Sequence, residues 1–180
     1  IQFGPTVVVR DATRRVTSMT TGNGHTHYEY DALGRVVVIE TENGSTEIGW
    51  TPEGDLASRV GPDGSRHLWH YDGEGNLVES IDATGRAVRI EYGPFDLPTA
   101  RVDGAGDRTE YTYDTELRLA TVTNPAGRVW RYAYDAAGRL SGETEFDGRT
   151  QRYTRDVAGQ LVAHTDPTGE TTHYGYDLLG

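Results

Sequence analysis

The chain has 180 residues, of which 35% are hydrophobic, and a formal net charge of −11. The absence of cysteine excludes a disulfide scaffold, a cysteine-ligated zinc site and a thiol nucleophile. The acidic balance argues against nucleic-acid binding, for which clustered positive charge supplies the affinity, and 23 glycines with 7 prolines are too many for a helical bundle. No stretch approaches the ~20 apolar residues of a membrane-spanning helix.

A repeat of about 21 residues runs through the chain. Tyr-Asp pairs mark it, and alignment on them gives nine anchor positions whose spacings are 20, 20 and then 21 six times. The anchors are Arg10, Tyr30, Trp50, Tyr71, Tyr92, Tyr113, Tyr134, Arg155 and Tyr176. A fixed period of this length is typical of repeat architectures, in which each copy is one supersecondary unit.

Two turns are expected in each repeat, one directly after the anchor and one halfway to the next anchor. Asp166-Pro-Thr-Gly169 shows the preferences of a type I β-turn: Asp or Asn first, Pro second and Gly fourth. From residue 14 to residue 180 we count seventeen such glycine positions, 10 or 11 residues apart, and glycine fills fourteen of them. The exceptions are Arg14, Asp96 and Leu117. The glycines, including Gly138, are predicted to have positive φ, which closes a hairpin with a bulge.

The segments between turns predict β-strands, because they are six or seven residues long and alternate in polarity. The position two residues before the anchor is mostly aromatic, as at Tyr132, and the position before that is mostly charged, as at Arg131. The returning strands, such as 77–81, alternate less cleanly. The sequence therefore predicts an all-β fold of antiparallel hairpins joined head to tail. About sixteen strands exceed the ~10 that an open sheet holds without curling, so we expect a curved wall.

The tyrosines indicate what kind of face this wall has. Tyrosine outnumbers phenylalanine eleven to three, which predicts a partly wet face or partners for the hydroxyl groups. Both ends fall within the repeat pattern, so we expect a piece of a longer array.

The unit at 127–140, GRVWRYAYDAAGRL, resembles the YD repeat of Rhs proteins, of the form GxxxxYxYDxxGRL. The resemblance extends from about residue 6 to residue 180. In that family, which includes bacterial Rhs effectors, the shell subunits of Tc toxins and animal teneurins, the repeats wind as a spiralling β-sheet around a hollow interior. The resemblance implies that residues 1–180 are one segment of a larger shell, without separate domains. The structural anchors it implies are Tyr30, Asp31, Gly34, Tyr71, Asp72, Gly75, Tyr113, Asp114, Tyr134, Asp135, Gly138, Tyr176, Asp177 and Gly180.

The resemblance also implies a function and partners. The shell of bacterial members encloses a C-terminal toxin, so the expected role is toxin encapsulation for delivery into competitor or host cells. The implied partners are the remaining repeats, the enclosed toxin cargo and the spike proteins of a secretion system. No cofactor, metal or catalytic residue is implied, and the expected location is outside the producing cell or inside a target cell. The departures from the motif lie at Trp50, Tyr92 and Arg155, with a local bend expected over Tyr92–Pro98.

A second function class stays open, since rows of tyrosine and tryptophan also suit a cell-surface module that binds glycan or protein. A third class, an enzyme, lacks a residue constellation that supports it. Bacterial Rhs shells are cut at Asp-Pro-x-Gly-Leu, but Glu170 replaces the leucine after Asp166–Gly169, which favours a plain turn.

Two candidate metal sites are incomplete. His25 and His27 share a strand face, but no third ligand follows at a fixed spacing, whereas His67 and His70 fall on opposite faces. The segment 72–76 imitates the start of a calcium loop, but Leu77 stands where that loop needs glycine.

Overall fold

A computed structural model describes residues 6–22 and 24–177 of the chain. The chain divides into two compact units, Ile1–Arg89 and Ile90–Gly180. The division falls inside strand β9 (Ala87–Tyr92), whose first three residues belong to the first unit and whose last three belong to the second.

The described residues form seventeen strands and one short 3₁₀ turn, which confirms the predicted all-β class. Before β9 come β1 (Val7–Arg10), β2 (Val16–Thr21), β3 (Gly24–Tyr30), β4 (Val36–Thr41), β5 (Gly44–Trp50), β6 (Leu56–Val60), β7 (Arg66–Tyr71) and β8 (Leu77–Ile81). After it come the 3₁₀ turn η1 (Pro94–Asp96), β10 (Pro98–Val102), β11 (Arg108–Tyr113), β12 (Leu119–Thr123), β13 (Val129–Tyr134), β14 (Leu140–Thr144), β15 (Thr150–Arg155), β16 (Leu161–Thr165) and β17 (Thr171–His173). Among these residues no helix is long and apolar enough to cross a membrane.

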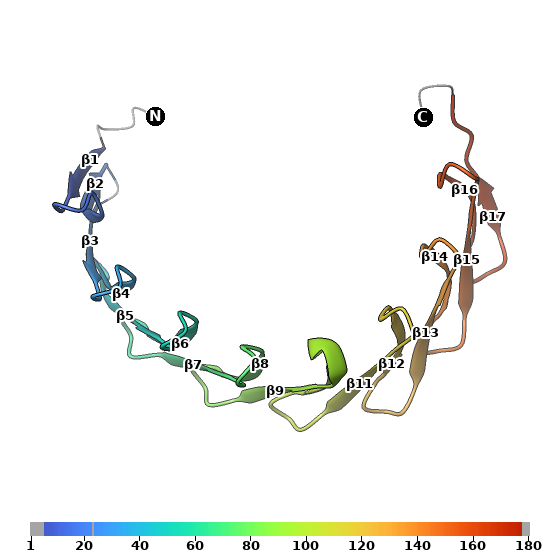
Figure 1. The fold of residues 1–180 in the computed structure, drawn as a ribbon, viewed down its shortest axis with the longest axis horizontal. Helices are drawn as coiled ribbons and strands as arrows, with labels where there is room; N and C mark the ends of the chain where they lie inside the picture. Colours follow the sequence, from blue (N-terminus) through green and yellow to red (C-terminus); the bar gives the residue numbers. More distant parts are fainter. Residues whose placement is uncertain (1–5, 23, 178–180) are drawn as a thin grey trace. The chain divides into compact units, whose positions relative to one another are not determined.

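Each strand pairs with the next strand along the chain, so the hairpin is the unit of the fold (Figure 1). In most hairpins a β-bulge interrupts the returning strand, opposite the step that leads to the anchor. In β13, Ala133 faces Gly142 but Tyr134 faces Leu140, so Ser141 is the extra residue of the bulge. A bulge bends the strand and redirects the side chains beside it. The anchor residue therefore lies where its strand ends and the turn begins.

The turns have the geometry that the sequence predicts. In the turn after Tyr134, the Asp135 N–H donates to Arg139 O and the Gly138 N–H donates to Asp135 O, both at 2.9 Å. Gly138 has φ of +79°, as predicted. At every turn position where the repeat pattern calls for glycine, the described residue has positive φ, and this holds also where Arg14, Asp96 or Leu117 replaces the glycine. Gly180 lies outside the described residues.

The first two repeats are one residue shorter because their halfway turns are shorter. In the β4–β5 hairpin, Thr41 pairs directly with Gly44, which leaves a two-residue loop. In the β6–β7 hairpin, Val60 pairs with Arg66 around a five-residue turn that the Gly61 N–H closes at Ser65 O. The loop is three residues shorter, but β4 and β5 are each one residue longer than β6 and β7, so the period differs by one residue.

The segment between β9 and β10 also closes as a turn, and the local bend expected over Tyr92–Pro98 is this turn. The Gly93 N–H donates to Leu97 O, and Phe95 and Asp96 both have positive φ. Pro98 is the first residue of β10, a position at which proline does not disrupt a ladder.

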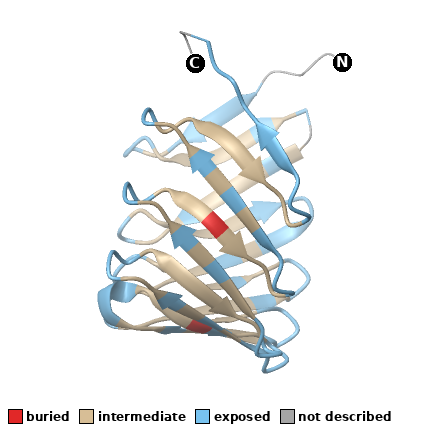
Figure 2. Cartoon of the chain, turned by 90° about the vertical axis from the view of Figure 1, so that its right-hand side faces the viewer, coloured by how far each residue is buried: buried red, intermediate tan, exposed pale blue. Residues whose placement is uncertain are grey.

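Burial is shallow throughout, and it differs between the two strands of a hairpin. The anchor strands β11 and β15 alternate strictly between exposed and half-buried residues, whereas the returning strands β12 and β16 are half-buried at every position (Figure 2). Among the described residues only Ala100 and Gly142 are buried, and the others are half-buried or exposed. The hairpins are therefore covered by their neighbours rather than by a central core.

Replacing Leu117 by glycine is expected to raise the free energy of unfolding by about 0.5–1 kcal/mol, because a side chain is strained at positive φ. Leu117 has φ of +62° and is 43% exposed, so little burial is lost. Glu116→Gly in the same turn is the control and should lower the stability slightly. Urea unfolding of both variants checks this; a loss of stability in Leu117→Gly would contradict it.

Candidate functional site at the turn edge

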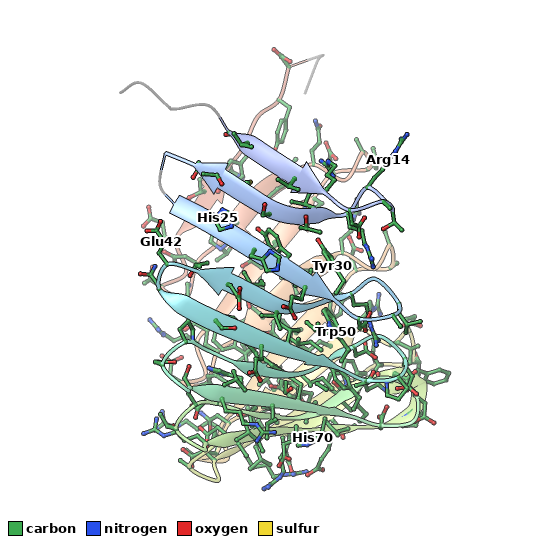
Figure 3. All side chains as sticks on the ribbon, turned by 90° about the vertical axis from the view of Figure 1, so that its left-hand side faces the viewer. Arg14, His25, Tyr30, Glu42, Trp50 and His70 are labelled. Atoms are coloured by element: carbon green, nitrogen blue, oxygen red, sulfur yellow. The ribbon has the colours of Figure 1, made fainter. Side chains whose placement is uncertain are left out.

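The anchor side chains lie along one edge of each unit, beside the turns that follow them. In the N-terminal unit, Arg14, Tyr30 and Trp50 lie along one edge, and His25 and Glu42 lie toward the opposite edge (Figure 3). The halfway turns thus lie at the edge of the sheet opposite the anchors.

Six anchor rings are hydrogen-bonded to the strand that precedes their own. The Tyr134 hydroxyl donates to Leu119 O at 2.9 Å, and the Trp50 indole N–H donates to Val36 O at 2.8 Å. The same bond to the first residue of the preceding strand is made by Tyr30, Tyr71, Tyr113 and Tyr176. The predicted partners of the hydroxyl groups are therefore backbone carbonyls.

The aspartate after the anchor organises its turn. The Asp135 carboxylate accepts the Ala137 and Arg139 N–H groups at 2.9 Å and pairs with the Arg139 guanidinium at 2.9 Å. Asp31 and Asp114 form the same ion pairs, with Arg35 and Arg118. The backbone N–H of Arg35, followed by its side chain, lowers the pKa of Asp31.

The turn arginine also reaches the next repeat. The Arg118 guanidinium lies 4.7 Å from the centre of the Tyr134 ring, and Arg35 lies 5.8 Å from the centre of the Trp50 ring. Arg35 Nη1 additionally donates to Thr51 O at 2.9 Å. Arg15 lies over Tyr30 in the same way, at 4.9 Å. Because a cation is attracted to the face of an aromatic ring, each arginine joins its own turn to the anchor of the following repeat.

The turns that end at Asp55, Asn76, Leu97 and Gln160 lack this arginine, and a hollow lies beside the first of them. In the turn 51–55 the fifth position is Asp55, and the Thr51 hydroxyl accepts the Gly54 and Asp55 N–H groups in place of an aspartate. A hollow of about 710 Å³ lies between this turn and the turn 72–75. The residues that line it include Trp50, Trp69 and Tyr71 together with Asp55, Glu53 and Glu74.

A second cluster lies on β13–β16 around Glu143. Its carboxylate accepts the Trp130 indole N–H at 3.0 Å and the Tyr153 hydroxyl at 2.7 Å. The Tyr153 ring stacks on His164 with 5.0 Å between ring centres. Burial, followed by the hydrogen bond to Glu143, raises the pKa of Tyr153 to about 12. The tyrosine thus stays protonated, and the network acts as a connection between strands.

The other residues singled out from the sequence do not converge. His25 is paired with the Thr20 hydroxyl, and His70 with Glu79, on separate hairpins. Within the described part of the chain, no three His, Asp or Glu side chains are arranged to hold a metal ion. Asp72 caps its own turn through the Glu74 and Asn76 N–H groups.

Asp166 forms a turn like the others. Its carboxylate accepts the Thr168 and Glu170 N–H groups, and the Gly169 N–H donates to Asp166 O at 3.0 Å. The segment thus forms the plain turn that the sequence predicts.

The anchor Arg155 departs from the edge pattern in structure as well as in sequence. Its Nη1 donates to Gly159 O at 3.3 Å, and its Nε is buried without a hydrogen-bond partner. Sequence reasoning did not foresee the arginine–ring contacts or the hollow. The signal was present, because arginine follows the turn glycine at positions 35 and 139 whereas Asp55 follows Gly54.

Comparisons with known proteins agree on one family. The RHS Repeat family matches residues 10–46, 71–108, 113–150 and 155–180. "Probable deoxyribonuclease RhsA" of Dickeya dadantii is 33% identical over 129 residues, which are 67% of this chain and 9% of that protein. "Double-stranded DNA deaminase toxin A" of Burkholderia cenocepacia is 30% identical over 110 residues, which are 53% of this chain and 8% of that protein.

The fold is shared with a solved structure. The crystal structure of TcdB2–TccC3 without its hypervariable C-terminal region superimposes with a TM-score of 0.75 at 20% identity, covering 96% of this chain and 10% of that one. The chain thus spans about a tenth or less of these proteins. With family matches over four stretches of the sequence and the hairpin repeat in the structure, this chain belongs to the RHS repeat family.

Proposed function

We propose that residues 1–180 are one continuous wall segment of an Rhs-type shell, which encloses a C-terminal toxin for delivery into another cell. The observation that carries the proposal is the RHS repeat itself, matched over four stretches of the sequence. Relatives named as a deaminase toxin and a probable deoxyribonuclease, and the fold shared with TcdB2–TccC3, support a role connected with toxins.

The contacts at the turn edge suit a structural role. Six of the nine anchors donate a hydrogen bond to the preceding strand, and three turn arginines lie over the anchor ring of the following repeat. A surface built from such hairpins extends by adding copies, and its stability accumulates from interfaces between adjacent repeats. The proposed partners are the other repeats of the same polypeptide, the cargo and the proteins that carry the shell out of the cell.

The experiment that tests this role uses the longer protein that contains the segment. If the segment is part of an enclosing wall, the cargo resists added protease while the wall is intact. Tyr113→Ala combined with Tyr134→Ala should expose the cargo, because both substitutions remove hydrogen bonds between adjacent strands. Tyr174→Ala, at a residue 42% exposed, is the control and should leave the cargo protected.

Two results would contradict the proposal. One is digestion of the cargo in the unaltered protein at the rate of the free cargo. The other is display of the segment on the producing cell with specific binding to glycan, which would support the surface-recognition function instead.

A further inference from the structure

The hollow between the turns 51–55 and 72–75 is explained by comparing it with the equivalent place in other repeats of the same chain. One repeat earlier, the Arg35 guanidinium lies between the turns 31–35 and 51–55, over the Trp50 ring and bonded to Thr51 O. The corresponding residue of the next turn is Asp55, and the corresponding ring is Tyr71. The hollow is therefore at the place that the guanidinium of Arg15, Arg35 or Arg118 occupies in its own repeat.

The lining has the chemistry that a guanidinium requires. Trp50, Trp69 and Tyr71 present aromatic surface, and aromatic faces attract cations. Asp55 is half-buried and lies near the Tyr71 hydroxyl. Burial of that hydroxyl, followed by the negative charge of Asp55, raises the pKa of Tyr71. Glu53 and Glu74 add two exposed carboxylates at the rim.

These carboxylates are not paired with a cation in the part of the chain that the structure describes. No ion pair among the described residues involves Asp55, Glu53 or Glu74. By contrast, the carboxylates of Asp31 and Asp114 are paired with the arginine of their own turn. The volume of about 710 Å³ falls within the range of about 300–1,000 Å³ common for ligand sites.

We propose that this hollow is a docking site for the arginine side chain of another polypeptide segment, which supplies from outside the guanidinium that the repeat lacks. The arginine lies over Tyr71, as Arg118 lies over Tyr134, and its guanidinium pairs with the Asp55 carboxylate. Arginine suits the site better than lysine, because its planar group stacks on rings and bonds a carboxylate with two donors. The proposal is independent of whether the shell encloses a toxin.

The test uses a blocked Gly-Arg-Gly peptide and the 180-residue chain with labelled tryptophan indoles. The chain has three tryptophans: Trp50 and Trp69 line the hollow, whereas Trp130 lies in the C-terminal unit against Glu143 and serves as an internal control. The arginine peptide should shift the Trp50 and Trp69 indole resonances and leave that of Trp130 in place. The same peptide with citrulline, which keeps the shape and loses the charge, should bind at least about tenfold more weakly.

Two variants place the binding at Asp55. Asp55→Arg restores the repeat pattern within the chain, so it should fill the hollow and weaken binding at least about tenfold. Asp55→Asn keeps the hollow open and should weaken binding severalfold. Asp107→Arg is the matched control, because it is the same substitution at the same position of a turn on the opposite edge, and binding should be unchanged.

Four results would overturn the proposal. They are the absence of any shift with the arginine peptide, equal binding of the citrulline peptide, equal binding of a lysine peptide, and full binding by Asp55→Arg.

Discussion

Tyr134→Ala is expected to destabilise the C-terminal unit by about 3 kcal/mol, through loss of the half-buried ring, its cation–π contact and its hydrogen bond. The ring lies under the Arg118 guanidinium at 4.7 Å, and the hydroxyl donates to Leu119 O at 2.9 Å. Tyr134→Phe removes only the hydrogen bond and should cost about 1 kcal/mol. Urea unfolding of the two variants measures both values.

A double-mutant cycle isolates the contribution of the arginine. Combining Arg118→Ala with Tyr134→Ala should reveal a coupling of about 0.5–1 kcal/mol, because each single variant already removes the cation–π contact. Purely additive losses would mean that the guanidinium and the ring do not stabilise one another. Equal losses in Tyr134→Ala and Tyr134→Phe would mean that the ring contributes nothing beyond its hydroxyl.

Gly138→Val is expected to lower the free energy of unfolding by about 1–2 kcal/mol, since a residue with a Cβ is strained at positive φ and a β-branched one especially so. Gly138 has φ of +79°, whereas the neighbouring Ala137 is exposed and has no positive φ. Ala137→Val is therefore the control and should cost much less. Equal shifts of the urea midpoint would contradict the turn assignment.

A second glycine separates backbone strain from crowding. A Cβ at Gly138 would lie 3.2 Å from Arg118 Nη1, whereas a Cβ at Gly127 would meet no atom within 4 Å. Gly127 has φ of +74°, so the backbone cost is the same at both positions. Similar losses for Gly127→Val and Gly138→Val would show that the backbone conformation sets the effect.

The periodic part of this fold could be predicted from sequence because the determinants are local. A turn needs positive φ at one fixed position, and glycine there is visible in most copies; the strands follow from the spacing between turns. The same reasoning identified Arg14, Asp96 and Leu117 as glycine positions without glycine, and all three have positive φ. The anchors could be found as recurring positions of the internal repeat, because equivalent positions have equivalent surroundings and therefore hold similar residue types.

The contacts at the turn edge could not be predicted in the same way. The Arg118–Tyr134 contact joins residues of different repeats, and it depends on the bulge that places Tyr134 opposite Leu140. The hollow beside Asp55 arises because position 55 is not an arginine. This can be recognised only when the place of the Arg35 side chain in the neighbouring repeat is known. The shorter loop after Thr41, together with longer strands on both sides, changes the period by one residue, but the period alone does not say which of the two turns has changed.

The way strands are covered has a consequence for how such a chain can evolve. Neighbouring strands in the sheet are consecutive in the chain, and nearly every described residue is only partly buried. A gene duplication or deletion of one whole repeat therefore leaves every other strand with neighbours of the same kind. A protein whose core gathers strands from distant parts of the sequence cannot tolerate this, because each strand there has a unique environment. The length of an RHS repeat array can thus change by recombination between copies, without compensating substitutions elsewhere.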